Sequence, residues 1–501
     1  MKKIFLSISI CFFTTQILGQ QLWIRETPTD MLISIQRTFN GEIALAGRSD
    51  SGVFLAITDT IGNIQWAKKY FTNHACTYKS FVQTRDSGFV ILGSSPDIFI
   101  LKVDKAGNIV WSQILATTVN LNYLYMAITY SDDGGVVIAV LDGNTYLCHI
   151  NQSGNLIWSY SYKAWSQFSP PEEDFLVTNV KGNYIFLTSQ YIGVNGSIAL
   201  TKIDTAGNLI MSKSYDYNSE RWSRSRASIV NTLDDGILIK LEVDSPAGHW
   251  GFPDPVAIQI FKTDSSGEVN WAREYRNDGL SCWPILKGSN FKQEYFFASS
   301  YPGASYNFIT KIDSVGNIDW SKGILHYVRD GIIFDDGSIM TAGSRGSGNT
   351  SLIRSDINGN SCGHYISNIY SSSLSIDVDT INPIRTTISD SLIPLAFTSD
   401  TGFTLTTTCS LIGIEEQYSP ANIIKLFPNP FHISTMLTSE IRFHEALLKI
   451  YNSLGILVRT EKNLEGGSYI LHRQTLPEGL YFFELISTES QFYSAGKFII
   501  E

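Results

Sequence analysis

The residues that could support chemistry are few, and they fit catalytic motifs poorly. One G-x-S-x-G string occurs, at residues 359–363, but a nucleophile elbow also needs a strand, a sharp turn and a helix around it. H-E-x-x-H and P-loop motifs are missing, and the eight His residues have no metal-ligand spacing. Asp356, Asn358 and Asn360 could begin a calcium loop, but the later glycine and the bidentate Glu are missing. We interpret this stretch as a capped turn and expect no catalytic motif and no metal.

Aromatic residues on long insertions are better candidates, because they could bind a ligand. Four tryptophans lie in stretches that exceed the repeat described below: Trp165, Trp222, Trp250 and Trp283. Aromatic side chains on surface loops can stack on sugars or anchor a protein partner. The alternative is that they cover local apolar surface, and the sequence leaves both interpretations open.

These insertions interrupt a repeat that is centred on a glycine turn. The glycines are Gly62, Gly107, Gly154, Gly207, Gly267, Gly316 and Gly359, at successive spacings of 45, 47, 53, 60, 49 and 43 residues. In a copy such as KVDKAGNIVW (102–111), the Asp accepts backbone N–H bonds and the glycine takes a positive φ, which predicts a type I turn between two strands. A second glycine turn precedes most copies by about twenty residues, as in DDGSIMTAG (335–343).

A tryptophan follows most of these turns and should hold neighbouring units together. It recurs as Trp66, Trp111, Trp158, Trp271 and Trp320, and Met211 replaces it once. A repeat of this length suits a four-stranded blade that cannot bury its faces alone. We therefore predict an all-β fold with a seven-bladed β-propeller of four-stranded blades at residues 21–362. Trp23 has no such turn before it, so the strand Leu22–Glu26 should close the ring by pairing with the strand before Asp356.

The first twenty residues indicate export. Residues 1–20 place Lys2 and Lys3 before a short apolar run, as a signal peptide does, and no later segment is apolar enough for a membrane span. A net charge of −10 argues against a nucleic-acid partner. Export permits disulfides, and Cys362 and Cys409 are a candidate pair that flanks the segment after the repeats. Residues 363–422 are expected to be a closing segment and linker.

The last eighty residues change character and predict a small Ig-like β-sandwich at 423–501. They resemble the type A C-terminal sorting domain of type IX secretion substrates, which are found in Bacteroidetes. The matching positions are Pro428, Asn429, Pro430, the Ile450–Gly455 hairpin, Gly479, Tyr481 and the terminal strand after Lys497. The resemblance implies recognition by the outer-membrane translocon, proteolytic removal of the tail, and release from the cell or attachment to its surface.

The leading functional hypothesis is a secreted or cell-surface propeller that binds a glycan or protein without catalysis. The alternative is a secreted hydrolase or lyase with a site in the central pocket of the propeller, built from residues distant in sequence. The repeat also resembles, more loosely, that of pyrroloquinoline quinone enzymes. Such enzymes need metal-binding acidic and amide residues around the cofactor, and we find no such set, so we expect no cofactor.

Overall fold

The structure is a computed structural model that contains strands and turns but no helix in the residues it describes. It describes residues 22–501 except 28–29, 51, 96, 117–124, 143, 164–174, 179–181, 193–194, 218–226, 244–256, 277–284, 290–291, 301–306, 325–326, 346–348, 362–364, 367–368, 402–404, 412–423, 453–455 and 488–491. The chain divides into two compact units, Gln20–Ile412 and a second that contains Gly413–Glu501. The all-β prediction is confirmed.

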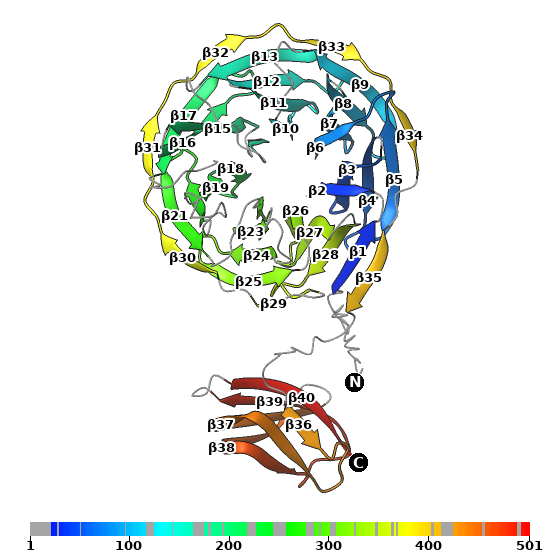
Figure 1. Ribbon diagram of the computed structural model, residues 1–501, viewed down its shortest axis with the longest axis vertical. Coiled ribbons are helices and arrows are strands. Elements are labelled where there is room, and N and C mark those ends of the chain that lie inside the picture. The colour runs from blue at the N-terminus through cyan, green and yellow to red at the C-terminus, as the bar shows by residue number, and fades with distance from the viewer. Residues whose placement is uncertain are drawn as a thin grey trace, which may run out of the picture. The chain divides into compact units, whose positions relative to one another are not determined.

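The larger unit contains seven five-stranded antiparallel sheets within its described residues, and Figure 1 shows them arranged in a ring. We number them in chain order, from the innermost strand outward. Sheet 1 has β2 (Met31–Arg37), β3 (Ile43–Arg48), β4 (Val53–Thr58), β5 (Ile64–Phe71) and β34 (Thr398–Asp400). Sheet 2 has β6 (Thr77–Gln83), β7 (Phe89–Ser95), β8 (Asp97–Val103), β9 (Ile109–Ala116) and β33 (Ser391–Pro394). Sheet 3 has β10 (Tyr125–Tyr130), β11 (Val136–Asp142), β12 (Asn144–Ile150), β13 (Leu156–Lys163) and β32 (Ile384–Thr387).

The other four sheets repeat this order. Sheet 4 has β14 (Leu176–Thr178), β15 (Tyr184–Ile192), β16 (Asn195–Ile203), β17 (Leu209–Tyr217) and β31 (Asp377–Thr380). Sheet 5 has β18 (Ala227–Asn231), β19 (Ile237–Val243), β20 (Ala257–Thr263), β21 (Val269–Arg276) and β30 (Tyr370–Ser373). Sheet 6 has β22 (Ile285–Gly288), β23 (Tyr295–Ser300), β24 (Asn307–Ile312), β25 (Ile318–Ile324) and β29 (Tyr365–Ile366). Sheet 7 has β26 (Tyr327–Ile333), β27 (Ile339–Arg345), β28 (Asn349–Ser355), β1 (Leu22–Thr27) and β35 (Thr406–Leu411).

The ring is closed by the N-terminal strand, as the sequence predicts. β1 pairs antiparallel with β28, with Trp23 opposite Arg354 and Thr27 opposite Thr350. Sheet 7 therefore contains strands from both ends of the repeat region. Because the chain continues from β1 into sheet 1, this pairing joins the first sheet to the last.

The fifth strand of each sheet was not predicted, and the expectation of four-stranded blades is wrong. Residues 365–411, which we call the belt, supply the outermost strand of all seven sheets and run around the ring against the chain order (Figure 1). The belt is fixed by backbone bonds from Leu374, Ile381, Ile388 and Leu395, whose N–H groups donate to carbonyls of Ala272, Ser212, Ser159 and Ser112. These four donors are seven residues apart, so one heptapeptide serves one sheet.

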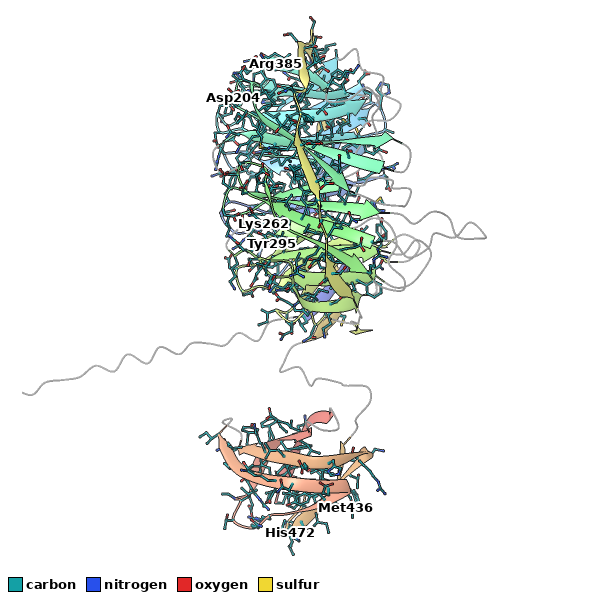
Figure 2. All side chains as sticks on the ribbon, turned by 90° about the vertical axis from the view of Figure 1, so that its left-hand side faces the viewer. Asp204, Lys262, Tyr295, Arg385, Met436 and His472 are labelled. Carbon is teal, nitrogen blue, oxygen red and sulfur yellow. The ribbon has the colours of Figure 1, made fainter. Side chains whose placement is uncertain are left out.

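Belt side chains also reach the neighbouring sheet. Arg385 of β32 donates from Nη1 to the carbonyl of Gly207 at 2.7 Å, and Figure 2 shows it near the turn that begins at Asp204. Its guanidinium lies 4.5 Å from the ring centroid of Tyr160. The belt therefore links sheet 3 to the turn of sheet 4 as well as extending sheet 3.

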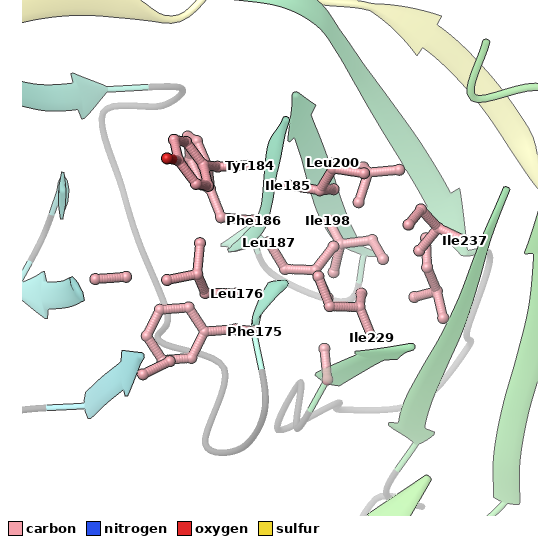
Figure 3. Packing of buried hydrophobic residues seen from close by; sticks show 14 of the residues in the cluster. Phe175, Leu176, Tyr184, Ile185, Phe186, Leu187, Ile198, Leu200, Ile229 and Ile237 are labelled. Carbon is pink, nitrogen blue, oxygen red and sulfur yellow. The ribbon is translucent and has the colours of Figure 1, made fainter. Parts of the chain in front are cut away.

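Apolar side chains fill the space between neighbouring sheets. One cluster joins residues of sheets 3, 4 and 5, and Figure 3 shows its middle, where Leu176 of β14, Phe186 of β15 and Ile229 of β18 gather. Phe186 and Ile229 are each only 1% exposed. The belt strand lies at the outer edge of each sheet, so the faces of the sheet pack against the neighbouring sheets. Burial of this apolar surface is the main force that holds the ring together.

The repeated glycine turns have the predicted geometry. In the copy at residues 104–108, the Asp104 carboxylate accepts hydrogen bonds from the backbone N–H groups of Ala106 and Asn108, and Gly107 has a φ of 75°. Backbone bonding to the Asp104 carboxylate keeps its pKa low although partial burial opposes this. The Asp356 turn is built in the same way. This confirms the interpretation of Asp356–Asn360 as a capped turn.

The repeated tryptophan holds neighbouring sheets together, as predicted, although it is half-buried in most copies. A Cβ built on Gly107 would lie 2.6 Å from the ring of Trp66 in the preceding sheet. Equivalent close approaches join Trp23 to Gly62, Trp111 to Gly154, Met211 to Gly267, Trp271 to Gly316 and Trp320 to Gly359. The positive φ and the closeness of the indole both require glycine at these turns.

The C-terminal unit has its own sheet and core. Its strands are β36 (Ile424–Phe427), β37 (Ser434–Asn452), β38 (Leu457–His472), β39 (Gly479–Ser487) and β40 (Phe492–Ile500). One half of β37 pairs with β36, and the other half pairs with β39, while β38 pairs along both halves. Apolar residues from all parts meet in one core that includes Leu437, Ile450, Phe483 and Phe498.

Candidate functional site

All four candidate ligand-binding tryptophans, Trp165, Trp222, Trp250 and Trp283, lie outside the described residues. The structure does describe the strands that flank them, and these strands share a feature. The strands of each sheet alternate in direction. The start of the first strand, the end of the second, the start of the third and the end of the fourth therefore all lie on one side of the sheet. In sheet 3, Tyr125 pairs with Leu141 and Thr145 pairs with Tyr162. We call this side of a sheet its loop edge, and the opposite side, which carries the glycine turns, its turn edge.

The strand ends that flank the four segments lie at loop edges of successive sheets. The segments connect β13 to β14, β17 to β18, β19 to β20 and β21 to β22. Each connection runs between two strand ends of the loop-edge kind, in sheets 3, 4, 5 and 6. The strand ends that these segments connect therefore all lie on the same side of the ring, in neighbouring sheets.

The turn edge of each sheet is occupied by structural interactions. In six of the seven sheets, within the described residues, a basic side chain on the third strand stands opposite the repeated tryptophan or methionine: Lys102, His149, Lys202, Lys262, Lys311 and Arg354. Lys102 is 2% exposed and its Nζ lies 2.7 Å from Asp86 Oδ1. The hydrogen bonds from Lys102 and Thr84 outweigh burial and lower the pKa of Asp86 to about 2.

A second residue at the turn edge was also missed from the sequence. A tyrosine four positions after the tryptophan or methionine is buried and donates its hydroxyl to the glycine carbonyl of the next sheet. Tyr70 bonds to Gly107 at 2.9 Å, and Tyr162, Tyr215 and Tyr275 make the same bond to Gly207, Gly267 and Gly316. Burial raises the pKa of Tyr70. The recurrent spacing W-x-x-x-Y could have revealed this contact.

The predicted sorting residues are brought together at the end of β40. The carboxamide of Asn429 accepts a hydrogen bond from the Ile499 N–H at 2.9 Å and donates to the Lys497 carbonyl at 3.3 Å. Asn429 therefore bonds to the outer edge of β40 as a neighbouring strand would. Pro428 and Pro430 flank it, and both follow cis peptide bonds.

The next residue continues this attachment. The Phe431 N–H donates to the Ile499 carbonyl, and its own carbonyl accepts from the Glu501 N–H. Its side chain is buried against Phe498, with ring centroids 5.7 Å apart. The segment Asn429–Phe431 thus covers the edge of β40 and fixes the end of the chain to the domain.

The remaining sorting residues have different environments. Tyr481 is buried, stacks on Phe498 with centroids 5.4 Å apart, and donates its hydroxyl to the Pro477 carbonyl at 2.8 Å. Gly479 has a φ of 148° and open space where a Cβ would be, so its backbone conformation, rather than crowding, favours glycine. Lys497 is exposed and stands opposite Phe482.

The outer face of the same sheet carries exposed apolar side chains. Leu457, Tyr451, Phe482 and Lys497 form one cross-strand row over β38, β37, β39 and β40, and Leu480 and Ile499 form the neighbouring pair. Leu480, Phe482 and Ile499 are 39%, 37% and 42% exposed. The sorting motif residues thus lie partly inside the domain and partly around this apolar face.

Only one of the two cysteines of the candidate disulfide lies among the described residues. Cys409 of β35 is disulfide-bonded, and Cys362 lies outside the described residues. Cys76 and Cys148 are buried and free. Pairing of Cys409 with Cys362 therefore stays a prediction.

Comparisons with known proteins identify the C-terminal domain. Residues 425–501 match the family model of the secretion system C-terminal sorting domain. No curated protein is significantly similar in sequence to the chain. Among the described residues no helix has the length and hydropathy of a membrane span.

Some solved structures show distant similarity. A protein of unknown function from Bacteroides caccae is 13% identical, with a TM-score of 0.32, over 59% of this chain and 93% of its own. Drosophila Plexin A, solved with Semaphorin 1b, is 9% identical, with a TM-score of 0.36, over 65% and 85%. PorZ of Porphyromonas gingivalis, a surface component of the type IX secretion system, is 8% identical, with a TM-score of 0.18, over 94% and 86%.

These TM-scores are too low to support any inference, so the assignment depends on the tail alone. The chain carries a type IX secretion system C-terminal sorting domain at residues 425–501, and it is a protein secreted from the cell or attached to its outer surface.

Proposed function

We propose that the chain is an exported seven-bladed β-propeller that binds a glycan or protein outside the cell without catalysis. Its Ig-like C-terminal sandwich would address it to the type IX translocon. The seven sheets with their ring arrangement support the propeller assignment (Figure 1). The sorting domain at 425–501 supports the translocon as a partner.

One observation supports binding most directly. The segments with Trp165, Trp222, Trp250 and Trp283 all connect strands at loop edges of successive sheets. The aromatic residues that the repeat does not use thus lie, in sequence, between strand ends on one side of the ring, while the regular turns connect strand ends on the other side. A rigid ring with variable insertions on one side is a common way of building a binding surface.

The described parts of the innermost strands offer no pair of carboxylates for the hydrolase or lyase alternative. Such an enzyme would need two or more acidic groups that converge near the ring axis. The described parts of the seven innermost strands contain one, Asp330, which is buried. Asp330 is held by Lys287 at 2.9 Å and by the backbone N–H groups of Ile35 and Gly331. These contacts give Asp330 a structural role.

The test is a screen of the full chain against glycans and extracellular proteins. Trp222→Ala and Trp250→Ala should each weaken a discovered interaction at least tenfold, the loss expected for a buried aromatic contact. Phe39→Ala is the matched control, because Phe39 is an aromatic residue at a turn, 53% exposed. Unchanged binding in both tryptophan variants, with all proteins folded by circular dichroism, would reject the loop-edge proposal.

A further inference from the structure

The C-terminal domain exposes more large apolar side chains than its size explains. Residues 425–501 make up less than a sixth of the chain. Nearly half of the exposed large apolar side chains in the described parts of the chain nevertheless lie between Phe427 and Ile499. Single exposed apolar residues are common on protein surfaces, but contiguous rows of them mark interaction surfaces.

One group of these residues lies on β39 and β40. Side chains along each strand alternate between the core and the outer face, and the outward positions of a sheet with one covered face are normally polar. Here Leu480, Phe482 and Ile499 occupy outward positions and are each more than one third exposed. Leu480 stands opposite Ile499, and Leu457, 49% exposed, extends the row of Phe482 beyond Tyr451. We call Leu457, Leu480, Phe482 and Ile499 the β39–β40 face.

Polar groups border this apolar face. Lys497 stands opposite Phe482 and is exposed. In the next row Lys449 stands opposite Glu484, whose Oε2 accepts a hydrogen bond from the Tyr451 hydroxyl at 2.8 Å. An apolar centre that includes an aromatic residue, with charged groups at its rim, is the usual arrangement of a protein–protein interface. The chemistry of the face therefore favours a protein as its partner.

Two of the predicted sorting residues border the same face. Gly479 directly precedes Leu480, and Lys497 ends the row on β40. Neither fills the core, because Lys497 is exposed and a Cβ on Gly479 would meet nothing within 4 Å. Tyr481 and Asn429, by contrast, pack or bond inside the domain. Recognition by another protein is therefore the better explanation for this part of the motif.

A second, narrower group lies on the other half of the domain. Phe427, Met436 and Ile470 form one cross-strand row over β36, β37 and β38, and Figure 2 labels Met436. The neighbouring positions of β37 on that side are Ser434 and Thr438, which are polar. This row has the same kind of exposed residue without an adjacent apolar row, so it supplies matched controls.

We propose that the β39–β40 face is the surface by which the sorting domain binds the type IX translocon, and that it docks on an apolar protein surface there. This inference rests on the proposed address to that translocon and names the residues that make the contact. Burial of Leu480, Phe482 and Ile499 drives the association, since removal of apolar area from water is the main favourable contribution to such contacts. Phe482 lies between Leu480 and the charged row, where an aromatic side chain contributes most.

The experiment expresses the full chain in a bacterium with an active type IX system and measures the secreted fraction. Phe482→Thr and Ile499→Thr should each lower this fraction, and the double variant should lower it about tenfold, as expected when central residues of an interface are lost. Threonine suits a strand, and both positions are exposed, so the thermal unfolding midpoint should stay close to that of the parent chain.

Two further measurements make the test specific. Ile470→Thr is the same substitution as Ile499→Thr at an isoleucine that is 52% exposed in the second row, and it should leave secretion unchanged. A photo-crosslinking phenylalanine analogue at position 482 should link the exported chain to a protein of the translocon, whereas the analogue at position 470 should not. If the double variant does not fold, the crosslinks decide.

The outcomes separate this inference from the proposed function. Normal secretion of the folded double variant, an equal loss for Ile470→Thr, or crosslinks from position 482 to a second copy of the chain would overturn the inference. The parent chain is also expressed in a strain without an active type IX system. If its secretion is lost there while the double variant is secreted normally in the active strain, the address stands and only the inference fails. Equal secretion of the parent chain in both strains would overturn the address and the inference together.

Discussion

The ion pair between Lys102 and Asp86 should respond unequally to removal of its two partners. The Lys102 side chain is 2% exposed and the Asp86 side chain is 29% exposed. Asp86→Asn leaves a buried, unpaired ammonium, and we expect it to lower the free energy of unfolding by about 3–5 kcal/mol. Lys102→Met leaves a carboxylate that water can reach, and we expect a loss of only about 1–2 kcal/mol.

The aspartate variant isolates the charge. Asp86 Oδ1 also accepts hydrogen bonds from the Thr84 hydroxyl and the Gly88 N–H, at 2.6 and 3.1 Å. Asparagine keeps an oxygen at that position, so the turn retains its acceptor. The matched control is Glu268→Gln, which removes the negative charge that pairs with Lys213 at 2.9 Å, where the glutamate side chain is 58% exposed. An exposed pair should contribute less than about 1 kcal/mol.

The pH dependence has a defined sign. The pKa of Asp86 is lowered from 3.8 to about 2, so the ionised carboxylate stabilises the fold above pH 3.8. This stabilisation is lost as the pH falls from 3.8 towards about 2. Denaturant unfolding followed by tryptophan fluorescence at pH 7 and pH 3 should show it in the parent chain, and the Asp86→Asn chain should lack this contribution. A loss for Asp86→Asn no larger than for Lys102→Met or Glu268→Gln would refute the reasoning.

Three further predictions concern other contacts. Gly107→Ala should destabilise the ring by more than about 1 kcal/mol, since it combines a positive φ with a clash against Trp66; Gly467→Ala, whose nearest contact is 3.5 Å away, is the comparison in thermal melts. Asn429→Ala should lower export, measured as the secreted fraction, because it removes both side-chain bonds to β40; normal export would show that these two bonds are dispensable for secretion. Peptide mapping of the exported protein without reductant should find Cys409 linked to Cys362, and any other partner would exclude that pairing.

The repeat made most of the ring predictable. Asp104 and Gly107 in the turn, and Trp66 against it, follow from local rules on turn geometry and from the need of each sheet for neighbours. The closure by Leu22–Glu26 followed from counting, because Trp23 lacked a turn and the last turn lacked a tryptophan. These features are local or periodic, so one sequence suffices to find them.

The belt was missed because its pairing is non-local and its strands are short. The belt strands have 2–6 residues. Strands such as Ile384–Thr387 are so exposed and polar that the sequence suggests a linker there. The signal that could have found them is the seven-residue recurrence of Leu374, Ile381, Ile388 and Leu395.

The candidate site was predictable only in part. The surplus tryptophans could be named from the sequence, and strand order then directs their segments to one edge. The structural role of Asp330 appears only when its partners are known, because Lys287 and the Ile35 N–H that bind it come from other sheets.

Hydrogen–deuterium exchange of the full chain with and without a ligand found in the screen tests the central claim most directly. We predict slower exchange in the segments between β13 and β14 and between β17 and β18. The glycine turns at residues 59–63 and 104–108 should not change. Protection confined to those turns, or no protection at saturating ligand, would contradict the account.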